Sequence, residues 1–225
     1  IGELLKPQVR RIAAQAGLVT ADKKDSQGIC FVGKVKLPEF LRQRLAAREG
    51  DIVEIPADSP VYRVREEALA AAPDEAARRA IRAQPYVYAP SDGKVIGRHH
   101  GAHFFTVGQR KGLDVGGRPE PLFVIATDTQ ANILYVGQGK SHPGLYRRAL
   151  WVPARDEHWV REDLRPPLGE GMRVLSRIRY RQPLEQATLW RTEQGVCLDF
   201  DRPQSAVTAG QFATAYLGEE LFFSG

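Results

Sequence analysis

The spacing of hydrophobic residues predicts two short helices in the first fifty residues. Apolar side chains near the N-terminus recur at the i, i+3, i+4, i+7 interval of an amphipathic helix, namely Val9, Ile12, Ala13 and Ala16. Pro7 suits the first turn of this helix, and Gly17 stands where its C-terminal cap belongs. A second helix is predicted to begin at Pro38 and to end near residues 48–50.

The middle of the chain mixes strand and helix patterns. Residues 51–55 are typical of a strand, and residues 65–82 are rich in alanine and charge, which predicts two short surface helices separated at Pro73. The Asp92-Gly93 pair predicts a turn between strands at residues 86–88 and 94–96. Residues 56–91 therefore have the character of an inserted helical segment.

From there to the C-terminus the pattern is mostly that of β-strands. Apolar runs at 122–126 and 133–136 flank a polar loop at 129–132, and runs at 188–190 and 196–198 flank a second loop at 193–195. Short strands at this spacing predict hairpins of a small closed barrel or sandwich.

The composition is that of an ordinary globular protein. Of the 225 residues, 43% are hydrophobic and 26% charged, and no apolar run approaches the ~20 residues that cross a bilayer. Two cysteines make no disulfide framework, and no signal-peptide pattern opens the chain, so we expect a cytoplasmic protein without a membrane partner. The net charge is +5, and residues 1–50 hold ten Lys/Arg against five Asp/Glu, which weakly indicates a polyanionic partner.

Cys30 stands in a lysine-rich segment that suits a reactive thiol on a loop. Lysines at positions 23, 24, 34 and 36 surround it, and Asp25 is the one acidic residue among them. Nearby positive charge lowers the pKa of a thiol from about 8.5 and so increases the reactive thiolate. Gly28 and Gly33 allow the backbone to turn sharply on both sides. The alternative is a buried cysteine packed among its apolar neighbours.

Residues 173–181 are predicted to form a strand with an arginine-rich face. Alternation sends Val174, Ile178 and Tyr180 to one face and four arginines to the other, namely Arg173, Arg177, Arg179 and Arg181. These arginines either contact successive phosphates or form a solvated face paired with acids on neighbouring strands.

Other candidate features favour structural interpretations. The basic loop at residues 106–113 is bounded by glycines but matches no phosphate-binding motif, so it is either an anion cradle or a turn. His99, His100 and His103 lack the neighbouring ligands of a zinc site, and no metal is predicted. Cys197 is expected to be an inert packing cysteine or a modestly exposed one, and the three tryptophans are expected to pack in the barrel.

Six segments, in this order and nearly from end to end, closely resemble the tRNA-specific 2-thiouridylases, which thiolate the wobble uridine of certain tRNAs. They are Lys6–Arg10, Asp25–Phe31, Thr106–Leu113, Leu134–Gly139, Arg179–Pro183 and Ala206–Gln211. Two departures from the family pattern are the length of residues 56–91 and Ala209, which stands where proline is common.

The resemblance implies a mixed α+β fold and a portion of a longer protein. Residues 1–34 resemble the helical end of an N-terminal α/β nucleotide-binding domain, residues 35–145 a small central α+β domain, and residues 146–225 an antiparallel β-barrel similar to those of translation factors. The family's glycine-rich pyrophosphate loop and first catalytic cysteine are not found in this sequence. ATP with Mg is thus expected to bind the full-length family members and not this chain, which we expect to be monomeric.

The resemblance also implies roles for individual residues. Cys30 matches the cysteine that receives sulfur as a persulfide from a donor protein, with Asp25 and Gly28 in a supporting part of the same motif. In the family, ATP activates the C2 oxygen of the uridine. The first cysteine then resolves the intermediate by forming a disulfide bond. Arg179, Tyr180 and Gln211 match tRNA-contacting residues, although alternation places Arg179 and Tyr180 on opposite faces.

The sequence therefore leaves three hypotheses. The first is the C-terminal portion of a tRNA 2-thiouridylase that is inactive by itself. The second is a non-catalytic RNA-binding β-barrel module, for which Cys30 is dispensable. The third is a sulfur carrier or redox protein without affinity for RNA.

Overall fold

The computed structural model describes residues 2–23 and 46–225, which belong to two compact units, residues 1–46 and 47–225. The first unit contains α1 (Lys6–Gln15), which confirms the predicted N-terminal helix. The helix ends before Gly17, whose φ of 65° is a left-handed value that glycine adopts without strain. The helix predicted from Pro38 lies outside the described residues, as do Asp25, Gly28 and Cys30.

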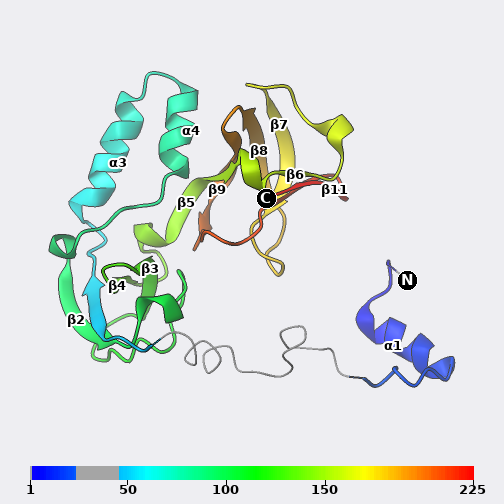
Figure 1. The fold of residues 1–225 in the computed structure, drawn as a ribbon, viewed down its shortest axis with the longest axis horizontal. Helices are drawn as coiled ribbons and strands as arrows, with labels where there is room; N and C mark the ends of the chain where they lie inside the picture. The colour runs from blue at the N-terminus through cyan, green and yellow to red at the C-terminus, as the bar shows by residue number, and fades with distance from the viewer. Residues whose placement is uncertain (1, 24–45) are drawn as a thin grey trace. The chain divides into compact units, whose positions relative to one another are not determined.

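A four-stranded sheet forms the first part of the second unit (Figure 1). Its strands are β1 (Gly50–Glu54), β2 (Lys94–His99), β3 (Leu122–Asp128) and β4 (Ile133–Gln138), in the order β2-β1-β4-β3. β1 and β4 run parallel, and the other neighbours are antiparallel. Ile52 and Val53 are both fully buried because the sheet is covered on two sides, and the predicted strand at 51–55 and hairpin at 129–132 are confirmed.

The hairpin predicted around Asp92-Gly93 is wrong. Residues 86–88 form no strand, and β2 pairs with β1 instead. Pro90 begins a 3-10 turn in which the Asp92 carboxylate accepts a hydrogen bond from the Ala89 N–H at 2.7 Å. Tyr88 is buried against Tyr62, and their hydroxyl oxygens are 3.1 Å apart. The aromatic residues that suggested a strand therefore serve to fill a core cluster.

Two helices, α3 (Pro60–Ala71) and α4 (Glu75–Ala83), lie side by side in Figure 1 and confirm the pair predicted for residues 65–82. They separate at Pro73, and the Asp74 carboxylate caps α4 by accepting from the Ala77 N–H at 2.8 Å. The prediction that both are surface helices is wrong for α4, which has one side partly buried. It packs on the second sheet, where the Arg79 guanidinium lies 3.7 Å above the Trp190 ring centroid.

The second sheet has seven antiparallel strands and curls into a half-barrel. They are β5 (Tyr146–Pro153), β6 (His158–Trp159), β7 (Gly171–Arg177), β8 (Glu185–Thr192), β9 (Gly195–Ser205), β10 (Thr214–Leu217) and β11 (Glu220–Ser224), in the order β5-β9-β8-β7-β10-β11-β6. Its core includes Leu189, Leu198, Phe200 and Phe222. The hairpin at 193–195 is confirmed, and so is the mixed α+β fold class with a curled antiparallel sheet.

The second sheet carries the predicted packing residues. Trp159 belongs to its core, and Cys197 is 2% exposed on β9 in a small cluster with Ala83 of α4. Trp151 and Trp190 are half-buried against that cluster. The interpretation of these residues as packing side chains is confirmed.

Gly137→Ala is expected to lower the free energy of unfolding by about 1–3 kcal/mol, the usual cost of overpacking. A Cβ at this position of β4 would lie 2.6 Å from Cε1 of His142. That ring cannot move away, since its Nε2 lies 3.0 Å from the Ile55 carbonyl oxygen and its Nδ1 accepts from the Gly144 N–H at 3.2 Å. Urea titration measures the change.

The matched control for this prediction is Gly116→Ala, because a Cβ at Gly116 meets no atom within 4 Å. We expect its urea midpoint to change little or to rise slightly. Equal destabilisation by both variants would show that the His142 contact is not the cause of the loss at Gly137.

Candidate RNA-binding groove

The predicted arginine strand ends earlier than expected. β7 stops at Arg177, and residues 178–182 turn, with the Gln182 N–H donating to the Arg179 carbonyl at 3.1 Å. Val174 and Ile178 are buried, as alternation predicts. Tyr180 is 86% exposed, however, so its predicted inward direction is wrong. Its direction differs because β-alternation no longer applies once the strand has turned.

The turn brings Arg179 against Gln211, and so joins two of the three residues that the resemblance implied. Arg179 Nε donates to Gln211 Oε1 at 3.4 Å, and Arg179 Nη2 donates to the Ser205 carbonyl oxygen at 3.3 Å and to that of Ala206. All three acceptors are neutral. Tyr180 lies next in sequence to Arg179, and its ring centroid is 6.0 Å from Arg177 Cζ.

Arg179 and Gln211 line a groove of about 450 Å³ within the second unit. One wall comes from residues 106–109 and Lys140, beside the four-stranded sheet, and the other from Arg179, Gln211 and the end of β9. The walls touch closely, because a Cβ at Gly108 would lie within van der Waals overlap of Ala206. Arg147 also links the end of α4 to the segment that follows Ala206, because its guanidinium donates to the carbonyl oxygens of Ala83 at 3.1 Å and Val207 at 2.9 Å.

The groove is positively charged and has no acidic lining residue. Lys140 is exposed there, and the Tyr146 hydroxyl positions its backbone by donating to its carbonyl oxygen at 2.8 Å. Among the described residues, neither Lys140 nor Arg179 is paired with a carboxylate. Arg173, by contrast, is bonded to both oxygens of Asp201 at 2.7 and 2.8 Å. The solvated-face interpretation therefore holds for Arg173 and not for Arg179.

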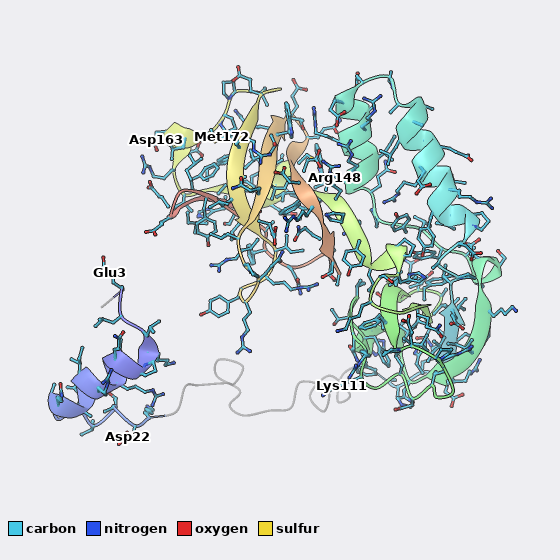
Figure 2. The ribbon with its side chains drawn as sticks, turned by 180° about the vertical axis from the view of Figure 1, so that it is seen from behind. Glu3, Asp22, Lys111, Arg148, Asp163 and Met172 are labelled. Atoms are coloured by element: carbon cyan, nitrogen blue, oxygen red, sulfur yellow. The ribbon has the colours of Figure 1, made fainter. Side chains whose placement is uncertain are left out.

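The basic loop at residues 106–113 is a turn in which the amides at positions 106, 108 and 109 donate hydrogen bonds within the protein. The Gly108 N–H donates to the Val124 carbonyl at 2.7 Å, and the Gln109 N–H donates to that of Thr106 at 2.9 Å. These two amides are not free to bind an anion. The basic side chains that follow, Arg110 and Lys111, are exposed, and Figure 2 labels Lys111. This loop contributes a wall of the groove and not an anion cradle.

Sequence reasoning missed Phe212, which follows Gln211 and is 72% exposed. Phe212 and Tyr180 are the aromatic members of the large hydrophobic side chains that are exposed in the described part of the chain. Each stands next in sequence to one member of the Arg179–Gln211 pair. A phenylalanine in a glycine-containing loop directly after a predicted binding residue was the signal that could have found it.

The remaining titratable candidates are structural. Burial raises the pKa of the Cys197 thiol to about 12, with Asp199 adding a smaller repulsion, so it stays protonated at neutral pH. Burial likewise lowers the pKa of His99, whose Nδ1 accepts from the Gly101 N–H at 2.9 Å. Among residues 2–23 and 46–225, no group of three or more His, Cys, Asp or Glu side chains could hold a metal ion.

Comparison with known protein families assigns a class to this arrangement. Residues 77–138 match a model described as a tRNA methyl transferase PRC-barrel domain, residues 152–225 an aminomethyltransferase beta-barrel domain, and residues 1–34 a tRNA methyl transferase HUP domain. The fold and these matches place the chain in a class of proteins that share these domains, two of which are described as tRNA methyl transferase domains.

The relatives specify the family. All 225 residues align with tRNA-specific 2-thiouridylases MnmA, at 55% identity in Flavobacterium johnsoniae and 52% in Christiangramia forsetii. The same protein of Pseudomonas entomophila is 41% identical over 230 aligned positions. The chain belongs to the tRNA-specific 2-thiouridylase family. It spans 56% of the length of the first two relatives and 50% of the third.

In the described part of the chain, no helix is both long and apolar enough to cross a membrane.

Proposed function

We propose that this chain takes part in 2-thiolation of the wobble uridine of tRNA, with Cys30 as the persulfide carrier and the Arg179 groove as part of the tRNA-binding surface. The observation that carries the proposal is the alignment of the whole chain, at 55% identity, with an MnmA 2-thiouridylase. The uncompensated positive charge at Lys140 and Arg179 supports an anionic ligand in the groove.

The proposed chemistry consists of two sulfur transfers. The Cys30 thiolate attacks the outer sulfur of a donor persulfide, the donor's S–S bond breaks and the donor's cysteine sulfur leaves as a thiolate, so that Cys30 carries S–SH. That terminal sulfur then attacks C2 of the uridine and displaces the activated oxygen. A second thiol attacks Cys30 Sγ, the S–S electron pair passes to the sulfur on the base, and a disulfide remains. ATP supplies the activation of the C2 oxygen.

We further propose that the 225 residues by themselves neither bind ATP nor thiolate tRNA. The glycine-rich pyrophosphate loop and the first cysteine of the family pattern are not found in this sequence. The domain divisions after residues 34 and 145, a monomeric cytoplasmic state and a separate sulfur-donor protein belong to the same proposal.

The test is nucleoside mass spectrometry of tRNA from cells whose own gene carries Cys30→Ser or, as a control, Cys197→Ala. We expect 2-thiouridine to disappear with Cys30→Ser and to persist with Cys197→Ala. The family models are described as methyl transferase domains, and loss of a methylated nucleoside instead of the thiolated one would favour that chemistry. An unchanged nucleoside profile would support a non-catalytic RNA-binding module.

A further inference from the structure

We propose that the face of the half-barrel around Arg179 binds an unpaired segment of RNA, with a base stacked on Phe212 and the neighbouring phosphates in the groove beside Lys140. This inference rests on the proposed function, because it takes RNA as the ligand. It adds binding residues, Phe212, Lys140 and the 106–109 wall, and it specifies that the bound RNA is single-stranded.

The first support is that, in the described part of the chain, the strongly exposed aromatic side chains each stand next in sequence to a residue that lines the groove. Tyr180 is 86% exposed and Phe212 72%, whereas the three tryptophans and the tyrosines at 62, 88 and 135 are buried or half-buried. The side chain of Phe212 has no polar atom and forms no hydrogen bond with water, so its exposure is not explained by hydration. Aromatic rings that stack on unpaired bases must be accessible in the free protein, and these two are.

The second support is where these rings lie relative to charge. Arg179 and Gln211 both line the groove and are hydrogen-bonded to each other. Phe212 directly follows Gln211 in the sequence, and Tyr180 directly follows Arg179. The groove volume of about 450 Å³ lies within the range of small-ligand pockets. A backbone segment of RNA can thus enter beside Lys140 and Arg179 while a base reaches the rim.

The third support concerns the kind of RNA. In an A-form duplex the bases are stacked inside, and proteins contact mainly phosphates and 2′-hydroxyls. Two exposed aromatic rings would contribute nothing to such a contact. An unpaired strand offers both phosphates and free base faces, and so uses every feature of this surface.

The experiment measures binding of the 225-residue chain to a single-stranded oligoribonucleotide and to a blunt-ended RNA duplex without unpaired nucleotides, each over a range of salt concentrations. Phe212→Ala is expected to weaken single-strand binding by about 5- to 150-fold with an unchanged salt slope. Phe212→Tyr is expected to retain binding, and Leu168→Ala, which removes another exposed apolar side chain, is the matched control.

Lys140→Ala tests the groove separately. It is expected to weaken binding and to reduce the magnitude of the salt slope by about one, whereas Lys94→Ala on β2, at the far edge of the four-stranded sheet, is expected to leave the slope unchanged. Circular dichroism checks that each variant is folded.

Two results would overturn the inference: single-strand binding that is unchanged by Phe212→Ala, or a fully paired duplex that loses as much affinity through Phe212→Ala as the single strand does. Absence of any RNA binding by the unmodified chain would instead contradict the proposed tRNA-binding role. The two failures are therefore distinguishable.

Discussion

Sulfur loading of this chain is expected to occur on Cys30 and to be abolished by Cys30→Ser. After incubation with a cysteine desulfurase, its donor relay and free cysteine, intact-mass spectrometry should show a gain of one sulfur atom per chain. The physical reason is thiolate availability: four lysines surround Cys30 in the sequence, and positive charge lowers the pKa of a thiol. With Cys30→Ser, we expect no gain of sulfur at all.

Cys197 supplies the internal control, because both thiols meet the donor in the same sample. It is 2% exposed, and burial raises its pKa to about 12, so it presents almost no thiolate and no path of approach. Cys197→Ala should therefore load as the unmodified chain does. Peptide mapping that finds the added sulfur on Cys197 and not on Cys30 would refute the site assignment.

Arg179→Ala is expected to weaken binding of tRNA by the chain by about 10- to 150-fold. Hydrogen bonds to charged groups contribute about 1.5–3 kcal/mol, and Arg179 has no carboxylate among the described residues to compensate its charge. The variant also removes one phosphate contact, so the magnitude of the salt slope should fall by about one. Arg179→Lys keeps the charge but loses the planar fork, and we expect an intermediate affinity.

Arg173→Ala is the matched control for Arg179→Ala. It removes the same side chain and the same formal charge from β7, the strand that leads into the Arg179 turn, but Arg173 is already bonded to Asp201 through both of its terminal nitrogens. We expect its tRNA affinity to change less than threefold, about the effect of ~0.6 kcal/mol. Filter binding at several salt concentrations compares the pair. Equal losses would mean that net charge, and not the groove, determines binding.

Local patterns predicted the elements well and their ends less well. The helix from Lys6, the α3–α4 pair and two β-hairpins followed from periodicity and from single residues such as Pro73 and Gly17. Tyr86 and Tyr88 led to the wrong prediction of a strand at residues 86–88, because a buried aromatic cluster and a strand produce the same short hydrophobic run. Tyr180 was misplaced because alternation was extended past Arg177, where β7 loses its pairing partners.

The sequence named two residues of the candidate site but did not predict that they lie together or which other residues line the groove. Arg179 and Gln211 came from the resemblance, and their hydrogen bond across 32 positions required the turn after β7 and the segment after β9 to meet. Lys140 and residues 106–109 had no sequence link to either. Phe212 resembled any loop phenylalanine until its exposure was known.

By itself, the sequence predicted most of the secondary-structure elements and a candidate cysteine for sulfur chemistry, because propensity, periodicity and nearby charge act over a few residues, and its motifs indicated the family. Only the tertiary structure decided that Cys197 is shielded, that Arg173 is neutralised by Asp201 and that Arg179 is not. Burial and ion pairing depend on atoms brought together from distant segments. The groove exists because a loop, a half-barrel turn and the end of β9 pack against one another.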